Sequence, residues 1–274
     1  ICGHSFKEML AGMIERLAAS MEAVLILCTV GFLVSSFMAS GAIPSLIVYG
    51  LDLLTPKLFL PVGCILCAIV GMACGSSWTT TATIGLAFLG IGAGLGIPAP
   101  ITAGMIISGA YVGDKFSPLS DTTNLAAAVA ETGLFDHVTA MVSTTGPTLL
   151  LSLILYTILG LNVDTSAYDA TVAEGIQEAF RGAFTISPIL LLPIIVVIVM
   201  CILRVPGLVG IAISVATATI FMMIFQSTDI YGSRALGDIF NMLHNGIVVE
   251  TGNDVADSIL GKAGGMNGTM WTIN

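Results

Sequence analysis

Long apolar runs separated by short polar interruptions dominate the chain. Each run is close to the length of about 20 residues with which a helix crosses a bilayer. A membrane β-barrel would instead show alternating segments of about ten residues, and that alternation is absent from this sequence. The pattern therefore predicts an all-α polytopic membrane protein. The clearest runs cover residues 22–40, 58–74, 138–160, 186–203 and 207–225.

The remaining segments indicate how the chain is divided. Residues 1–20 mix charged and apolar positions, which is typical of an interfacial amphipathic helix. Residues 41–56 are apolar but short, and suggest a re-entrant or interfacial segment, whereas residues 161–185 are polar and acidic and predict a loop. We expect a transport domain over residues 21–225, with about six or seven spans plus broken or re-entrant segments. The more polar residues 226–274 then begin a truncated second half.

Composition excludes several classes of protein. Apolar residues make up 56% of the chain and charged residues 9%, far from the roughly one quarter of charged residues in a soluble domain. The chain has a net charge of −9 and only eight Lys and Arg residues, and this low number of basic residues argues against a nucleic-acid partner. The chain has no HExxH zinc motif. An intramembrane aspartyl protease would need a Tyr-Asp pair within a span, but the single such pair, Tyr168-Asp169, lies in a polar stretch. We therefore expect no enzymatic activity and no catalytic residue.

A hydroxyl-rich segment directly follows the second apolar run. Gly75 is placed to end that helix in a left-handed conformation, and Ser76 or Ser77 to cap the next helix. A helix broken at membrane depth exposes backbone groups that are tolerated only against protein or a water-filled cavity. The hydroxyls of this segment would then be oxygen ligands for a cation, or alternatively would bond back to their own helix. The candidate ligands are Ser76, Ser77, Thr79 and Thr80.

Four alternating glycines follow at positions 90, 92, 94 and 96. They form two small-xxx-small pairs, a spacing that lets helix backbones approach closely. A phosphate-binding loop would need a Lys-Ser or Lys-Thr pair after the glycines, which this sequence lacks. The pattern therefore predicts tight helix packing.

The strongest candidate site is the polar stretch from residue 108 to 124, which has apolar runs on both sides. Asp114 and Asp121 are the carboxylates of this stretch, and two neighbouring carboxylates bind a proton or a metal cation in competition. Ser117-Pro118 is a helix start signal, and Asp121 is an equally good cap one turn later. The alternative is an ordinary polar loop in water. The neighbouring candidate ligands are Ser117, Ser120, Thr122, Thr123 and Asn124.

Discontinuous helices that offer oxygen ligands near the bilayer midplane are typical of secondary transporters. We therefore expect Asp114 and Asp121 to bind Na⁺ or protons together with the hydroxyls of both segments. Residues 9–15 resemble residues 242–250, so either a second structural repeat begins near residue 236, as in many secondary transporters, or the similarity arises by chance in low-complexity sequence. The expected partners are the lipid bilayer and small ions or a small organic acid, with a homo-oligomer as a further possibility and no cofactor.

Several of these motifs together resemble the NhaC-type sodium/proton antiporter family. The resemblance rests on the run Gly75-Ser-Ser-Trp-Thr-Thr80, on Gly96-Ile-Pro98, and above all on Gly113-Asp-Lys-Phe-Ser-Pro-Leu-Ser-Asp-Thr-Thr123. It implies a multi-pass secondary transporter of the bacterial cytoplasmic membrane, built from inverted repeats and exchanging Na⁺ for H⁺. Members of the family are longer than this chain, so we expect the chain to be a piece of a longer protein.

The same family includes exchangers of malate and lactate, which leaves two substrate classes open. The carboxylates Asp114 and Asp121 favour a cation. A helix that begins between residues 117 and 121 favours an anionic group at its N-terminus. Na⁺/H⁺ exchange is therefore the first hypothesis, and a Na⁺- and H⁺-coupled exchanger of organic acids or amino acids is the alternative.

Overall fold

The computed structural model describes residues 5–118, 120–162, 170–203, 205, 207–233, 235–247, 249–254 and 256–257. Within this part of the chain every regular element is a helix, which confirms the predicted all-α class. The first half contains α1 Phe6–Ala39, α2 Ala42–Leu53, α3 Pro56–Cys74, α4 Ser77–Thr80, the π-helical η1 Thr81–Gly85, α5 Leu86–Gly94, α6 Ala99–Phe116 and α7 Asp121–Val129. The second half contains α8 Leu134–Leu161, α9 Ala170–Ala183, the 3₁₀ turn η2 Pro188–Leu191, α10 Leu192–Ile202, α11 Gly207–Phe225, α12 Thr228–Tyr231 and α13 Leu236–Asn245.

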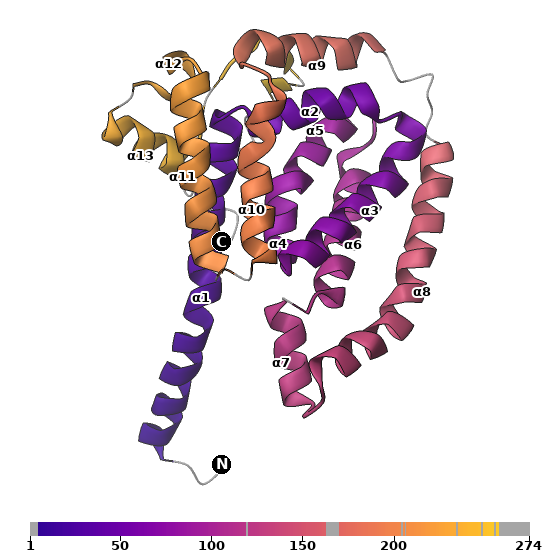
Figure 1. Cartoon of the computed structure of the whole chain (residues 1–274), viewed down its shortest axis with the longest axis vertical. Helices are drawn as coiled ribbons and strands as arrows, with labels where there is room; N and C mark the ends of the chain where they lie inside the picture. The colour runs from indigo at the N-terminus through magenta and orange to yellow at the C-terminus, as the bar shows by residue number, and fades with distance from the viewer. Residues whose placement is uncertain are drawn as a thin grey trace.

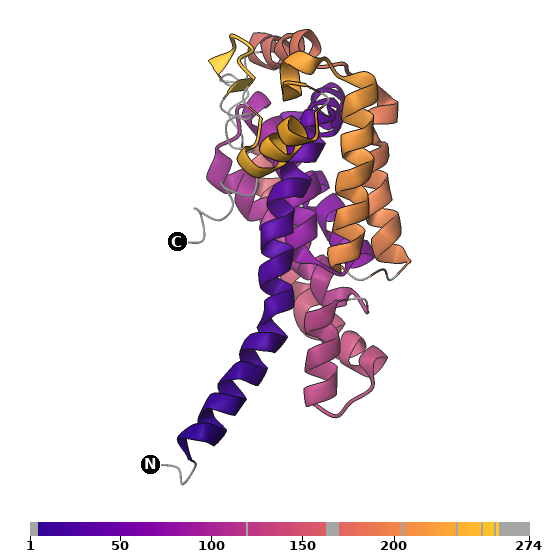
Figure 2. The same ribbon diagram turned by 90° about the vertical axis from the view of Figure 1, so that its left-hand side faces the viewer.

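The helices form a bundle with a hydrophobic core shared by most of them. α3 and α6 make the most extensive helix contact, and α10 and α11 form an antiparallel hairpin beside α1. α8 runs along one flank, and α9 lies across one end of the bundle (Figure 1). The N-terminal part of α1 projects beyond the rest of the molecule (Figure 2). Phe37, Phe59 and Phe180 are the largest of the fully buried side chains.

In the described part of the chain, three helices are long and apolar enough to cross a membrane, or up to five if each bent pair is one span. The sequence predicts about six or seven spans. The difference arises mainly between residues 75 and 130, where the helices are either short or, like α6, not apolar enough. α1 and α2 meet at 67°, which agrees with the re-entrant segment predicted at residues 41–56. The 90° bend between α9 and the η2–α10 segment lies at the end of the predicted loop and was not expected there.

The first helix differs from the predicted interfacial segment followed by a separate span. Residues 6–39 form one helix of 34 residues. Ser5 and Glu8 form a capping box, in which Ser5 Oγ accepts from the Glu8 N–H at 3.3 Å and Glu8 Oε2 accepts from the Ser5 N–H at 3.0 Å. At 1.5 Å per residue the helix is about 51 Å long, against a hydrocarbon core of about 30 Å. One helix therefore covers both predicted segments.

The predicted loop over residues 161–185 is wrong for residues 170–183, which form α9. Ala173, Ile176 and Phe180 are buried on one face of this helix, whereas Glu174 and Glu178 are exposed. The apolar spacing of three and four residues is the signature of an amphipathic helix. The acidic residues on the outer face concealed that signature in the sequence.

The glycines of α5 pack as predicted at two positions. A Cβ atom on Gly92 would lie 2.5 Å from Thr102 Oγ1, and one on Gly94 would lie 2.7 Å from Leu51 Cδ2. A side chain at either position would force Thr102 or Leu51 to move. The glycines therefore bring α5 close to α6 and to α2.

Candidate functional site

The crossing of α3 and α6 determines where Asp114 lies. A Cβ atom on Gly109 would collide with the Cys64 carbonyl oxygen, and one on Gly113 with the Ala68 carbonyl oxygen. The two backbones are therefore in direct contact, as small residues allow between membrane helices. The four glycines at residues 90–96 predict this kind of packing, and the same small-xxx-small spacing at residues 109 and 113 is a further signal of it in the sequence.

The break between α3 and α4 has the predicted geometry. Gly75 ends α3 in the left-handed region, with φ 64° and ψ 24°. Ser76 caps α4, because its Oγ accepts from the Thr79 N–H at 3.3 Å. The five π-helical residues Thr81–Gly85 follow at once, which the sequence did not predict. π-Helical turns inside α-helices occur frequently at functional sites.

Asp114 connects the polar stretch at residues 108–124 to the hydroxyl-rich segment that follows Gly75. Asp114 is 5% exposed and lies where α3, α4 and α6 pack together. Ser77 Oγ donates a hydrogen bond to Asp114 Oδ2 at 3.4 Å, and Ser77 is also 5% exposed. Burying a carboxylate is expensive unless it is paired or hydrogen-bonded. A buried carboxylate beside a helix break is therefore a candidate binding site.

The connection from α6 to α7 surrounds the backbone of Asp114. The Ser117 N–H and the Thr123 hydroxyl both donate to the Asp114 carbonyl oxygen, at 3.2 Å and 3.3 Å. Ser120 Oγ accepts from the Thr123 N–H at 3.4 Å. Ser117, Ser120 and Thr123 are all buried. The structure therefore gathers these three predicted residues around the end of α6.

The start of α7 corrects the predicted helix start at Ser117-Pro118. α6 continues to Phe116, and Ser117 is extended, with φ −83° and ψ 124°. Because Ser117 terminates one helix, it is not the cap of the next. α7 begins at Asp121, and Ser120 caps it through its bond from Thr123, so the alternative cap at Asp121 is also wrong.

The hydroxyls of Thr79 and Thr80 bond within their own helix. Thr80 Oγ1 donates to the Ser76 carbonyl oxygen at 2.9 Å, and Thr79 Oγ1 donates to Ser76 Oγ at 3.2 Å. These bonds match the alternative prediction for this segment, in which the hydroxyls bond back to their own helix. Ser77 is the member of this predicted group whose hydroxyl reaches across to Asp114.

The last predicted ligands lie at the outer side of α7. Thr122 and Asn124 are exposed. The Thr122 hydroxyl lies 2.9 Å from the Ser120 hydroxyl, and Asn124 Nδ2 donates to the Ser120 carbonyl oxygen at 2.8 Å. The side chain of Asp121 lies outside the described part of the structure, so its pairing with Asp114 stays a prediction.

The donor set around Asp114 consists of oxygen atoms. Among the described residues, no group of three or more His, Cys, Asp or Glu side chains is arranged to hold a metal ion. Hydroxyl, carbonyl and carboxylate oxygens are instead the ligands of hard cations. The oxygen atoms near Asp114 are therefore of the type that binds a hard cation.

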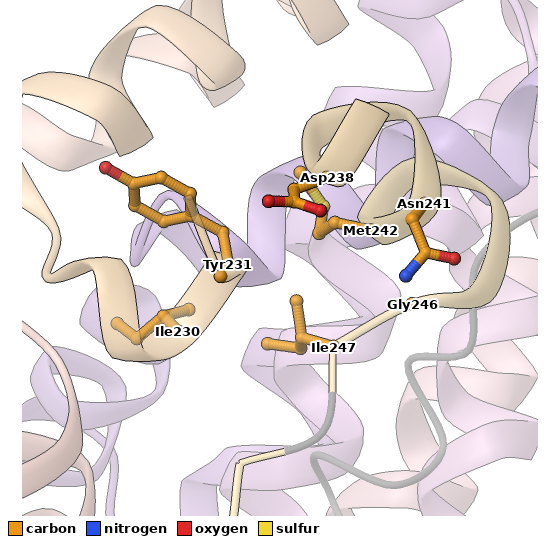
Figure 3. Close-up of a pocket in the computed structure, with 8 residues that line it drawn as sticks. Ile230, Tyr231, Asp238, Asn241, Met242, Gly246 and Ile247 are labelled. Carbon is orange, nitrogen blue, oxygen red and sulfur yellow. The ribbon is translucent and has the colours of Figure 1, made fainter. Parts of the chain in front are cut away.

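A surface pocket with a volume of about 240 Å³ lies elsewhere, between α12 and α13 (Figure 3). The side chain of Asp238 accepts a hydrogen bond from Ser233. The hydroxyl of Tyr231 points away from Asp238 and Asn241 in this view. None of the predicted ligands lines the pocket. Its lining residues are Ile230, Tyr231, Gly232, Asp238, Asn241, Met242, Gly246 and Ile247.

Three curated relatives that match nearly the whole length of this chain are all named as antiporters. The arginine/ornithine antiporter ArcD of Halobacterium salinarum is 37% identical over 273 residues, which cover 99% of this chain and 55% of that protein. The malate-2H⁺/Na⁺-lactate antiporter of Bacillus subtilis is 35% identical over 96% of this chain and 55% of its own length. The Na⁺/H⁺ antiporter NhaC of Alkalihalophilus pseudofirmus is 35% identical over 98% of this chain and 56% of its own length.

The chain thus spans a little over half the length of these relatives. No solved structure matches it. The model of the Na⁺/H⁺ antiporter family matches residues 3–123 and 109–274, which together include nearly the whole chain. The chain therefore belongs to the Na⁺/H⁺ antiporter family.

Proposed function

We propose that the protein is a secondary active transporter that exchanges Na⁺ for H⁺ across the bacterial cytoplasmic membrane. The observation that carries this proposal is the buried carboxylate of Asp114, which accepts a hydrogen bond from Ser77 beside a helix break. Membership of the Na⁺/H⁺ antiporter family supports antiport in general. The protein acts as a transporter and not as an enzyme.

The mechanism follows from the chemistry of a buried carboxylate. A carboxylate in a low-dielectric interior needs a bound cation or a proton to offset its charge. Na⁺ and H⁺ therefore compete for Asp114, and occupation by one releases the other. Movement of one half of the transporter against the other then opens the site to either side of the membrane.

Each residue near Asp114 has its own role in the proposed mechanism. Asp114 carries the proton or neutralises Na⁺, and Ser77 provides a hydroxyl oxygen next to it. Ser117, Ser120 and Thr123 hold the chain at the end of α6. Asp121 supplies a second carboxylate at the start of α7. Na⁺ and H⁺ are the substrates, and the proposal requires no cofactor and no partner beyond the bilayer, with a homo-oligomer as an optional assembly.

The second candidate is a Na⁺- and H⁺-coupled exchanger of organic acids or amino acids. The names of two relatives favour it, because they describe arginine/ornithine and malate/lactate antiport at the same level of identity as NhaC. The N-terminus of α7 also lies beside Asp114, next to Ser120 and Thr123. Helix N-termini attract anionic groups such as a carboxylate.

Everted membrane vesicles distinguish the two candidates. The vesicles contain the complete protein and carry a preformed acid-inside pH gradient. Collapse of the gradient on addition of NaCl alone is the expected result. Collapse only when malate, lactate, arginine or ornithine is also present would favour the second candidate. Vesicles without the protein are the control, and no response to any of these additions contradicts both.

A further inference from the structure

Three ends of helices meet at one buried side chain far along the chain from Asp114. α1 ends at Ala39 before its 67° bend into α2, and α9 ends at Ala183 before its 90° bend toward η2 and α10. α11 ends at Phe225, and the next residue is Gln226. The Gln226 side chain is 6% exposed. In Figure 1, α2, α9 and the end of α11 lie near the top of the bundle.

The amide of Gln226 bonds to both bends. Its Oε1 accepts from the Thr185 N–H at 3.0 Å, and its Nε2 donates to the Thr185 carbonyl oxygen at 3.1 Å. The same Nε2 donates to the Ser40 carbonyl oxygen at 3.0 Å. Thr185 lies in the link between α9 and η2, and Ser40 lies in the break between α1 and α2. One side chain therefore joins two helix breaks to a third helix end.

The break between α1 and α2 is shaped to admit this amide. Gly41 has φ +79°, a conformation that favours glycine. A Cβ atom at Gly41 would lie 2.5 Å from Gln226 Nε2 and 3.1 Å from the Thr185 carbonyl oxygen. Glycine is therefore required here for two reasons, the backbone conformation and the close approach of the amide.

Backbone groups at a helix break have no partner within the helix. In the interior of a membrane protein, such groups must be satisfied by other protein groups. Gln226 does this at both breaks, and the low dielectric constant of the interior strengthens each bond. One side chain thereby connects the end of α11 to the break before α2 and to the link before η2.

We propose that Gln226 is a positioning residue that makes the two helix breaks move together with the end of α11 during transport. The role of Gln226 in transport rests on the proposed function, whereas its coupling of the two helix breaks does not. Gln226 bonds to the backbone at Ser40 and Thr185, and it acts on the moving elements and not on the ion.

Hydrogen exchange of backbone amides in the complete protein tests the coupling. The variants are Gln226→Ala and the milder Gln226→Asn, which keeps the amide but shortens its reach by one methylene. Gln177→Ala is the matched control, because Gln177 also joins two elements, through bonds from its Nε2 to Asp52 Oδ1 and to the Val48 carbonyl oxygen. The amide of Ser45 reports on the first break, since it bonds to the Gly41 carbonyl oxygen and not to Gln226.

In Gln226→Ala, exchange should rise at least about fivefold at both Thr185 and Ser45, because local opening of either break exposes both. Gln177→Ala should leave both amides within about twofold of the unaltered protein. A rise at Thr185 alone would mean that Gln226 only caps one segment, and would overturn the coupling. If Gln226→Ala does not fold, the same comparison is made with Gln226→Asn.

Transport kinetics of the same variants test the role in movement. Turnover should fall about tenfold while the KM for Na⁺ changes less than about twofold, as expected of a residue that affects a conformational step. Unchanged turnover in a variant with loosened breaks would overturn the role in transport. If the unaltered protein shows no Na⁺/H⁺ exchange, the proposed function fails, and the hydrogen-exchange result still decides whether Gln226 couples the breaks.

Discussion

Ser77 Oγ donates a hydrogen bond to Asp114 Oδ2, although 37 residues separate the two side chains in the sequence. This bond crosses from the first turn after a helix break to the last turn of α6. Both side chains are buried. The contact therefore provides a specific place at which to test the proposed ion site.

Replacing Asp114 with Asn removes the negative charge while keeping the shape of the side chain. We expect Na⁺-dependent proton movement to fall by at least about tenfold, because buried ionisable groups of membrane proteins are usually functional. The measurement is the initial rate of gradient collapse in everted vesicles, corrected for the amount of protein.

The matched control for this substitution is Asp136→Asn, which removes an exposed carboxylate in the first turn of α8. It should retain nearly the full rate. Equal rates for Asp114→Asn and the unaltered protein would exclude Asp114 as the proton and Na⁺ ligand.

Ser77→Ala tests the hydroxyl that contacts Asp114. Losing one hydrogen bond of this kind costs about 1 kcal/mol, so we expect the apparent affinity for Na⁺ to weaken by about fivefold. Thr81→Ala is the control, because the Thr81 side chain is exposed and bonds to the Ser77 carbonyl oxygen within its own helix. The concentration of NaCl that gives half the maximal rate is the quantity to compare. Equal changes in the two variants would argue against a special role for Ser77.

Gly113→Ala tests the backbone contact between α3 and α6. The added methyl group would collide with the Ala68 carbonyl oxygen, so we expect destabilisation by about 1–3 kcal/mol or more. Gly104→Ala in the same helix is the control, since its Cβ atom would meet only Tyr156 Oη, at 3.5 Å. Thermal unfolding of both variants in detergent makes the comparison. A Gly113→Ala protein as stable as Gly104→Ala would show that the helices do not cross this closely.

Two substitutions in α9 test whether its buried apolar face or its surface ion pair holds this helix against the bundle. Phe180 is fully buried, and we expect Phe180→Ala to cost about 3–5 kcal/mol of stability. The ion pair between Arg181 and Asp52 is 3.8 Å long and half exposed. Arg181→Ala should therefore cost less than about 1 kcal/mol. Denaturant unfolding checks both, and the reverse order would contradict the amphipathic assignment of α9.

The features that the sequence predicts well depend on neighbouring residues. The left-handed conformation of Gly75 and the cap at Ser76 follow from the preferences of glycine and serine at helix ends. The apolar runs likewise predict α3, α8 and the α10–α11 hairpin close to their observed bounds. Local chemistry and hydropathy are sufficient for features of this kind.

The features that the sequence does not predict depend on distant contacts. The bond from Ser77 to Asp114 requires the close approach of α3 and α6. The bonds of Gln226 link it to Ser40 and Thr185 across 186 and 41 residues. The helix α9 was missed for another reason, because its acidic residues outweighed the spacing of Ala173, Ile176 and Phe180.

The π-helical turn at Thr81–Gly85 makes the number of residues in this segment as important as their identity. A π turn holds one residue more than the α-helical turn that it replaces. Because the wider turn accommodates that residue, α5 keeps the orientation that it would have in an uninterrupted α-helix one residue shorter. Deleting one residue there should therefore restore an α-helix and leave Gly92 and Gly94 facing Thr102 and Leu51. Inserting one more residue would instead exceed what a single π turn accommodates and rotate α5 by roughly 100°, so the segment should tolerate a deletion better than an insertion.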